Sequence, residues 1–405
     1  MSAHVQGFLR VGHLPTLCSA VQYLGLSSMG WALLGALGNH VAGEFGLTTS
    51  QKGLLVALPL LSGAVLRLVL GLLVDHFGAK RTGQLGLVLT LAPLLYGWLG
   101  CATVTDVYLI GLLLGVAGAS FAVAVPLTSR WYPPEYQGLA MGLVGVGNSG
   151  TLLATLFAPR LAEAFGWRCV FGLAVIPLLI SLILFTLLAR ERPNPAPPEP
   201  FRKQFAILRE PDLLNFCCLY AITFGGFMGF ASFLTIFYHD QYGLEKVHAG
   251  DMATVCILAG SALRPVGGYL ADRCGGTHVL PRLYFGVAAA LAALSFLPPF
   301  WFALPLFLVL LALLGAGSGA VFQLVPLRFR VHLGAATGII GAAGGLGGFF
   351  LPTWLGYTRT YTGSYGTGLA ILACLCVSGA ALLFKVRPGW NAGFLQANAG
   401  ARASL

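Results

Sequence analysis

Charged residues are scarce in this chain. Asp, Glu, Lys and Arg make up 9% of its 405 residues, whereas a soluble domain typically carries about 25%. Apolar residues supply 57%. So few charges exclude a soluble globular protein and indicate a membrane protein, whose main partner is the lipid bilayer.

Sequence motifs typical of disulfides, metal sites and catalytic sites are missing as well. The nine cysteines include no C-x-x-C pair, and their apolar surroundings are typical of small packing residues rather than of disulfides or metal ligands. No nucleophile–base pair stands out. Residues 1–16 lack the apolar core and the cleavage site of a signal peptide. We therefore expect neither an enzyme nor a bound metal or cofactor, and we expect the first span to act as an uncleaved signal.

Long apolar runs dominate the sequence. A membrane-spanning helix needs about 20 mostly apolar residues. Twelve such runs occur, at roughly 17–41, 51–76, 82–101, 106–130, 138–162, 167–190, 213–240, 249–272, 278–300, 302–328, 334–357 and 364–386. They predict an all-α membrane protein with twelve transmembrane helices.

Basic residues are distributed unevenly among the loops between these runs. The formal net charge is +10, from 23 Lys and Arg against 13 Asp and Glu. With both termini inside, sixteen basic residues fall in cytoplasmic segments and five outside, as the positive-inside rule requires. This pattern predicts a multi-pass protein of the cytoplasmic (inner) membrane with both termini in the cytoplasm. It also argues against a nucleic-acid partner.

The chain contains an internal repeat. Residues 62–75 (SGAVLRLVLGLLVD) match 259–272 (AGSALRPVGGYLAD) at a shift of 197, and two further segment pairs match at shifts of 200 and 196. The proline-rich, charged stretch 191–212 lies between the halves and reads as a cytoplasmic linker. We therefore predict two six-helix bundles, 1–190 and 213–405, arranged as in major facilitator transporters, with substrate bound at the midplane between them.

Two arginines lie inside apolar runs, and the repeat pairs them. A charge at the bilayer centre costs about 2.5–3.5 kcal/mol on insertion scales, so Arg67 and Arg264 indicate a functional site. Snorkelling, or ion pairs with Asp75 and Asp272, are the alternatives. Each aspartate lies eight residues away, about 12 Å along a helix, which disfavours both. We expect both arginines to face one central cavity and to clamp an anion through paired N–H donors.

Glycine is dense in the fifth and eleventh runs, at 142–150 (GLVGVGNSG) and 338–352 (GIIGAAGGLGGFFLP). Two interpretations stay open, close helix packing and direct backbone contact with a small ligand. For the second, the candidate residues are Gly145, Gly147, Gly341 and Gly344, with Asn148 as an amide donor. Gln323 is a weaker polar candidate.

Aromatic residues recur at helical spacing in the seventh run. Tyr220, Phe224, Phe227 and Phe230 form a stripe, and Phe121 lies in the fourth run. Such residues pack against neighbouring helices or lipid, or they form flat walls around a planar ion.

Together these residues resemble the nitrate/nitrite porter family of the major facilitator superfamily. The resemblance rests on both glycine signatures, on the arginine pair, and on Tyr220 and Phe224. It implies that Arg67 and Arg264 coordinate nitrate or nitrite, that Tyr220, Phe224 and Phe121 stack on the ion, and that Asn148 and the glycines complete the site.

A loop motif extends the resemblance. Residues 75–81 (DHFGAKR) resemble the D-x-x-G-x-[KR]-R loop of major facilitator transporters, which implies a gating contact for Asp75. Asp272 is the repeat equivalent, and a solvated helix end explains it equally well.

The positions of the titratable residues bear on whether transport is coupled to protons. All eight histidines and all acids lie outside the middle of the runs, whereas proton symport usually uses a titratable group near the substrate. We therefore expect a monomeric transporter that exchanges nitrate for nitrite. Proton-coupled nitrate uptake and a carrier for another small anion, such as a carboxylate, are the alternatives.

Overall fold

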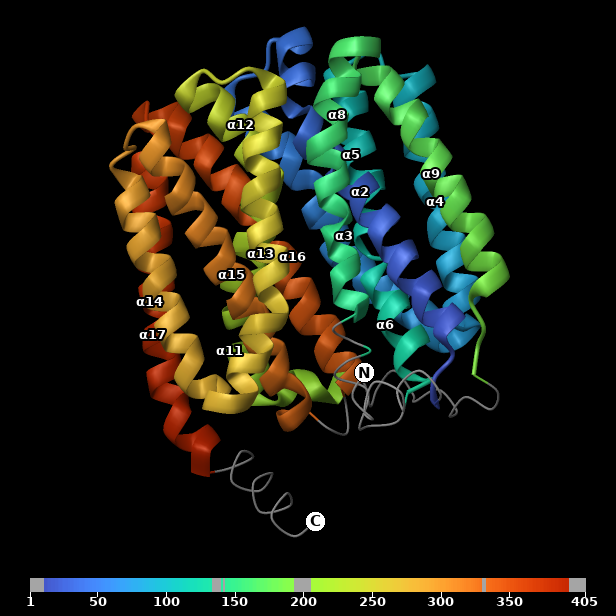
Figure 1. Cartoon of the computed structure of the whole chain (residues 1–405), viewed down its shortest axis with the longest axis vertical. Coiled ribbons are helices and arrows are strands. Elements are labelled where there is room, and N and C mark those ends of the chain that lie inside the picture. Colours follow the sequence, from blue (N-terminus) through green and yellow to red (C-terminus); the bar gives the residue numbers. More distant parts are fainter. Residues whose placement is uncertain (1–10, 133–139, 141–142, 193–204, 330–332, 393–405) are drawn as a thin grey trace, which may run out of the picture. The chain divides into compact units, whose positions relative to one another are not determined.

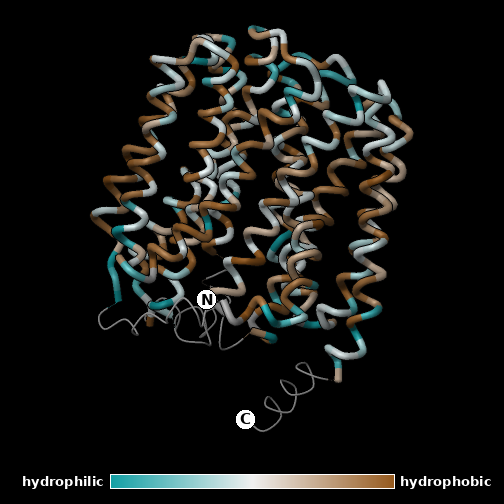
Figure 2. Tube along the Cα trace, turned by 180° about the vertical axis from the view of Figure 1, so that it is seen from behind, coloured by the Kyte–Doolittle hydropathy of each residue, from teal (hydrophilic) through white to brown (hydrophobic). Residues whose placement is uncertain are grey.

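A computed structural model of the protein describes residues 11–132, 140, 143–192, 205–329 and 333–392 (Figure 1). Every regular element among these residues is a helix, which confirms the predicted all-α class. Eleven helical stretches of the described chain are long and apolar enough to cross a membrane. Each falls on a predicted run, and hydrophilic residues gather toward the helix ends (Figure 2).

The remaining predicted run, 138–162, is only partly described. Its described portion includes the 3₁₀ turn η1 (Gly147–Gly150) and the helix α8 (Thr151–Phe165). The turn carries Asn148 and therefore places this residue at an irregular point of the span.

Packing divides the chain into two compact units. Unit 1 comprises residues 1–47, 58–199 and 244–251, and unit 2 comprises 48–57, 200–243 and 252–405. The segments 48–57 and 244–251 each contain the start of a helix whose remaining residues belong to the other unit.

In unit 1, helix α2 is the central element. It packs against α5, α6, α8 and α9, while α4 packs against α5 and α9. Gly46 ends α2 because its φ of 61° is a left-handed conformation that glycine adopts without strain. The further bounds are α2 (Leu14–Phe45), α4 (Ala79–Leu99), α5 (Val104–Gly118), α6 (Phe121–Ser129) and α9 (Trp167–Leu188).

In unit 2, one span is interrupted by a π turn. Helix α11 (Pro211–Tyr220) runs through the π turn η3 (Ala221–Gly225) into α12 (Gly226–Tyr242), and α16 packs against all three elements. Helix α14 packs against α15 and α17. The bounds are α14 (Gly276–Ser295), α15 (Phe300–Arg328), α16 (Leu333–Thr362) and α17 (Gly366–Trp390).

The helices that carry the two arginines have the same length and register. Helices α3 (Thr49–Phe77) and α13 (Lys246–Cys274) have 29 residues each, and Arg67 and Arg264 both occupy the nineteenth position. The internal repeat therefore extends to the helix boundaries.

Two ion pairs involve residues in the first two turns of these helices. Within unit 2, the Lys52 ammonium donates to both carboxylate oxygens of Asp240, at 2.7 and 2.9 Å. The two side chains are only 16% and 13% exposed. Within unit 1, Arg160 pairs with Asp251 at 2.7 Å.

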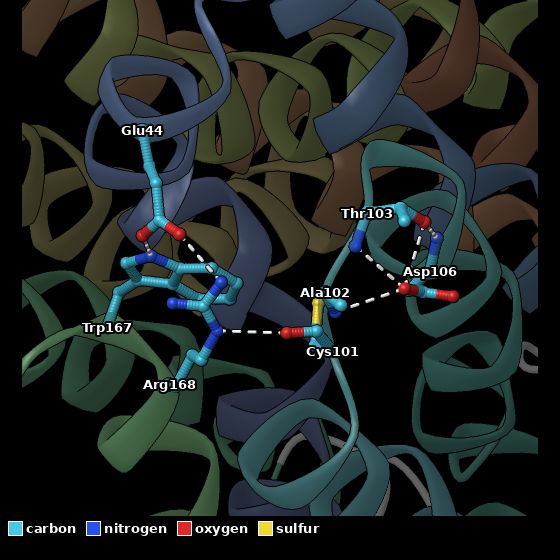
Figure 3. A network of polar contacts seen from close by, with 7 residues as sticks. All are labelled: Glu44, Cys101, Ala102, Thr103, Asp106, Trp167 and Arg168. Carbon is cyan, nitrogen blue, oxygen red and sulfur yellow. Dashed lines mark hydrogen bonds and ion pairs between the residues drawn. The ribbon is translucent and has the colours of Figure 1, made fainter.

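A polar network joins three parts of unit 1 where α2 ends (Figure 3). The Glu44 carboxylate accepts from the Trp167 indole and from the Arg168 guanidinium, both at 2.6 Å. The Nε of Arg168 also donates to the backbone carbonyl of Cys101, at 3.0 Å. The network thereby ties α2 and α9 to the loop between α4 and α5.

The same loop is fixed at the start of α5. Thr103 and Asp106 form a capping box, and the Asp106 carboxylate also accepts the N–H of Ala102 at 3.0 Å. Burial, and next the charge of Asp106, raise the pKa of the Cys101 thiol to about 11. The thiol is therefore protonated at neutral pH.

Candidate functional site

Arg67 is buried in unit 1 among aromatic rings and backbone. The residue is 4% exposed, and its Nε donates to the carbonyl of Gly118 at 3.0 Å. The guanidinium carbon lies 5.5 Å from the ring centre of Trp31 and 6.0 Å from that of Phe121. Aromatic faces attract cations, most strongly where water is excluded. We call Arg67, Trp31, Phe121 and Gly118 the first half-site.

A break between α5 and α6 makes the carbonyl available. The N–H of Ala122 bonds to the carbonyl of Ala119, three residues back. An uninterrupted α-helix would direct this N–H to Gly118. The Gly118 carbonyl is instead available to Arg67, so the local backbone irregularity supplies a polar partner inside an apolar span.

Trp31 is a member of the first half-site that sequence reasoning missed. Its indole N–H donates to the carbonyl of Pro59 in α3 at 2.7 Å, and its ring occupies the space where a side chain at residue 118 would lie. The sequence carries no signal for it, because the repeat pairs Met29-Gly30-Trp31-Ala32 with 228–231 (MGFA) at a shift of 199, and Trp31 therefore with the packing residue Phe230.

Arg264 is the centre of a second aromatic site, in unit 2. Its Nη2 donates to the Tyr220 hydroxyl at 3.1 Å, and its guanidinium carbon lies 5.4 Å from the ring centre of Phe224. The rings of Tyr220 and Phe224 are stacked, with centres 4.9 Å apart and planes 3° from parallel. The structure thus brings together three of the predicted site residues.

A π turn lies where these two rings stack. The turn η3 (Ala221–Gly225) directly follows Tyr220 and includes Phe224. A π turn is wider than an α turn because its hydrogen bonds run from i to i+5, and such turns are frequent at functional sites. The sequence pattern predicted a continuous helix here, so the π turn is a feature that only the structure provides.

Two further residues hold the stack in place. Phe322 of α15 meets Tyr220 edge to face, with ring centres 4.7 Å apart. Gly344 of α16 lies against both rings, since a Cβ there would be 2.7 Å from Tyr220 and 2.8 Å from Phe224. We call Arg264, Tyr220, Phe224, Phe322 and Gly344 the second half-site. Phe322 was not a predicted site residue, whereas Gly344 was.

The glycines of the first signature serve different purposes. A Cβ at Gly147 would lie 2.9 Å from the Cβ of Leu24, and Gly150 contacts the backbone of Gly25, so both pack against α2. Gly145 has no atom within 4 Å of the place a Cβ would occupy. Packing therefore accounts for Gly147, while Gly145 borders open space. Asn148 is buried in η1, at 6% exposure.

The remaining predicted residues are not among the contacts that define the half-sites, or their side chains lie outside the part of the chain that the structure describes. Gln323 directs its amide oxygen toward the start of α14, since a Cβ at Gly276 would be 2.9 Å from that oxygen. Gly341 is buried in α16. The side chains of Asp75 and Asp272, the predicted gating residues, lie outside the part that the structure describes. No cluster of metal-ligating side chains occurs among the residues searched in the described chain.

The remaining aromatic residues of the stripe are packing residues. Phe227 lies against Gly260, where a Cβ would be 2.5 Å from its ring, and Phe230 meets Phe307 edge to face. Tyr220 and Phe224 are therefore the stripe members that contact an arginine.

Comparison with known proteins relates this geometry to a family. The family model of the Major Facilitator Superfamily matches residues 23–352. Among solved structures, a bacterial homologue of the human lysosomal transporter Spinster, in an inward-facing and occupied conformation, has a TM-score of 0.66. That likeness covers 92% of this chain and 96% of the other at 16% identity, and it supports the fold alone.

Three curated relatives are similar over most of their length. A probable nitrate/nitrite transporter, NarK2, of Mycobacterium tuberculosis is 36% identical over 84% of this chain and 88% of its own. A nitrite extrusion protein of Bacillus subtilis is 32% identical (85% and 87%), and a probable nitrate/nitrite antiporter, NarK1, of Thermus thermophilus is 30% identical (88% and 86%). The chain therefore belongs to the nitrate/nitrite porter family of the Major Facilitator Superfamily.

Proposed function

We propose that this protein carries nitrate and nitrite across the cytoplasmic membrane by alternating access. The observation that carries the proposal is the arginine pair, at the same position of two repeat-related helices, with aromatic rings around each guanidinium. Family membership supports the same function, since the relatives above are named for nitrate or nitrite.

The chemistry of each half-site suits a small planar anion. A guanidinium offers five N–H donors in a flat fork, and Arg264 uses one of them on Tyr220. Trigonal oxyanions accept such donors in pairs. The aromatic faces attract the cation and hold its plane, while ring edges, which are electropositive, tolerate a nearby anion.

We propose further that the transported anion contacts both arginines in the course of transport. A bound anion compensates buried guanidinium charge. An empty carrier leaves both guanidiniums uncompensated, so it would be costly to reorient. This reasoning favours exchange of nitrate for nitrite over uniport.

The distribution of basic residues supports the proposed orientation. The excess of Lys and Arg in alternate loops favours both termini in the cytoplasm. The ion pair of Lys52 with Asp240 and the Glu44 network then lie toward the outer side of the membrane. We propose that the protein works in the membrane as a monomer, and that Asn148, Gly145 and Gly341 contribute to its anion site.

Transport by purified protein in liposomes tests the function. We expect uptake of nitrate that internal nitrite accelerates and that external nitrite inhibits, with little inhibition by formate or chloride. Stimulation by a pH gradient without internal nitrite would indicate proton symport instead. Stronger inhibition by formate than by nitrite would indicate a carboxylate carrier, and no uptake of either nitrogen oxyanion would refute the proposal.

A further inference from the structure

A tyrosine that is not a member of the second half-site contacts the backbone beside it. Tyr284 of α14 is 1% exposed, and its hydroxyl donates to the carbonyl of Leu219 at 2.6 Å. Leu219 directly precedes Tyr220. The Thr223 hydroxyl donates to the same carbonyl at 3.2 Å. Two hydroxyls from different helices therefore converge on one backbone oxygen.

This oxygen lies where the backbone changes its hydrogen-bonding pattern. The π turn η3 begins two residues later, at Ala221. Turns of this kind interrupt the regular i to i−4 ladder, and buried backbone carbonyls that lose a regular partner need another one. The Tyr284 hydroxyl comes from another helix and holds the backbone at that point, where the π turn begins. The Thr223 bond to the same carbonyl is an i to i−4 bond of the kind that regular helices also contain.

The space around η3 is shaped for the same conformation. A Cβ at Gly379 of α17 would lie 2.6 Å from the Tyr284 ring and 2.8 Å from the Ile222 side chain. Glycine at 379 therefore lets the tyrosine and the π turn lie side by side. On the α16 side, Gly347 contacts the carbonyl of Ala221 closely.

We propose that Tyr284 is a positioning residue for the anion site. By holding the Leu219 carbonyl, it maintains the π turn, and the π turn sets the stacking of Tyr220 and Phe224 against Arg264. The inference rests on the proposed function, because anion affinity is the property that it explains. Without the hydroxyl the fold persists, but the stack and the guanidinium lose their fixed geometry.

The test compares Tyr284→Phe with Tyr238→Phe in nitrate uptake by the full-length protein in liposomes. Tyr238 is a matched control, since it is buried in the same unit and its hydroxyl contacts Cys256, away from the half-site. Loss of one hydrogen bond predicts that Tyr284→Phe raises the KM for nitrate about five-fold. The maximal rate per folded protein should change less than two-fold. Tyr238→Phe should leave both values unchanged.

A double-mutant cycle separates positioning from general stability. In a Phe224→Leu background the stack is already lost, so Tyr284→Phe should raise the KM no further. If Tyr284→Phe fails to fold, Thr223→Val removes the other donor to the same carbonyl and should raise the KM in the same way. A wild-type KM in the variant that folds, or equal effects of Tyr284→Phe with and without Phe224, would overturn the inference. Wild-type protein that transports neither nitrate nor nitrite would instead refute the proposed function.

Discussion

Replacing Gly344 with alanine probes the second half-site directly. The new Cβ would lie 2.7 Å from Tyr220 and 2.8 Å from Phe224, whereas carbon atoms in contact are about 3.5–4.0 Å apart. Both aromatic residues are 2% exposed, so they have little room to retreat. The stacked pair must therefore shift by roughly 1 Å relative to α16.

The two consequences of that shift differ in size. Overpacking costs about 1–3 kcal/mol, while alanine in place of glycine stabilises a helix by about 1 kcal/mol. The net loss of stability is thus about 0–2 kcal/mol. A displacement of 1 Å at a reacting group can lower turnover by about 100-fold, so we expect nitrate uptake efficiency to fall by roughly 10- to 100-fold.

Thermal melting in detergent and uptake into liposomes measure the two effects separately. Gly338→Ala is the matched control, because it adds the same methyl group to the same helix at a position with no atom within 4 Å. The control should melt at or above the wild-type temperature and transport normally. If Gly344→Ala transports nitrate with wild-type efficiency, the position of the stacked rings does not affect the anion site and the reasoning is wrong.

Three further predictions concern residues away from the half-sites. Asp240→Asn should destabilise the protein by roughly 1–3 kcal/mol in thermal melts, because it leaves the Lys52 ammonium without its carboxylate. The swapped pair Lys52→Asp with Asp240→Lys should regain part of the lost stability. Additive losses of stability in the swapped pair would contradict the prediction. At pH 7.5, Cys101 should react with an impermeant maleimide at least roughly 100-fold more slowly than a thiol of an unfolded chain, since its pKa of about 11 leaves little thiolate. The labelling rate should rise toward pH 10. Fast labelling at pH 7.5 would refute the prediction. Thr103→Val should lower stability by about 0.5–2 kcal/mol through loss of the capping box, with unchanged KM for nitrate.

Sequence reasoning predicted the features that depend on composition and periodicity. The apolar runs correspond to the membrane-length helices, and the repeat shift of 197 alone predicts one register for Arg67 and Arg264. These features follow from the residues of a single helix or from a comparison of two segments. They therefore need no knowledge of tertiary contacts.

The missed features arise from contacts between helices. The π turn beside Tyr220 contacts the Tyr284 hydroxyl from α14 and a closely packed α16, and neither contact is visible in the sequence of the span itself. Trp31 joined the first half-site because Gly118 leaves room for its ring. The two glycine interpretations could be separated only once the neighbours of Gly147 and Gly344 were known.

Nitrate binding to arginine-to-lysine variants tests the central claim most directly. Arg67→Lys and Arg264→Lys keep the positive charge but remove the planar fork that pairs with an oxyanion. Equilibrium binding of nitrate to purified protein should weaken at least about ten-fold in each variant, the loss expected when a charged hydrogen bond worth roughly 1.5–3 kcal/mol is removed. Wild-type affinity in either variant would contradict the proposal that the substituted arginine binds the anion.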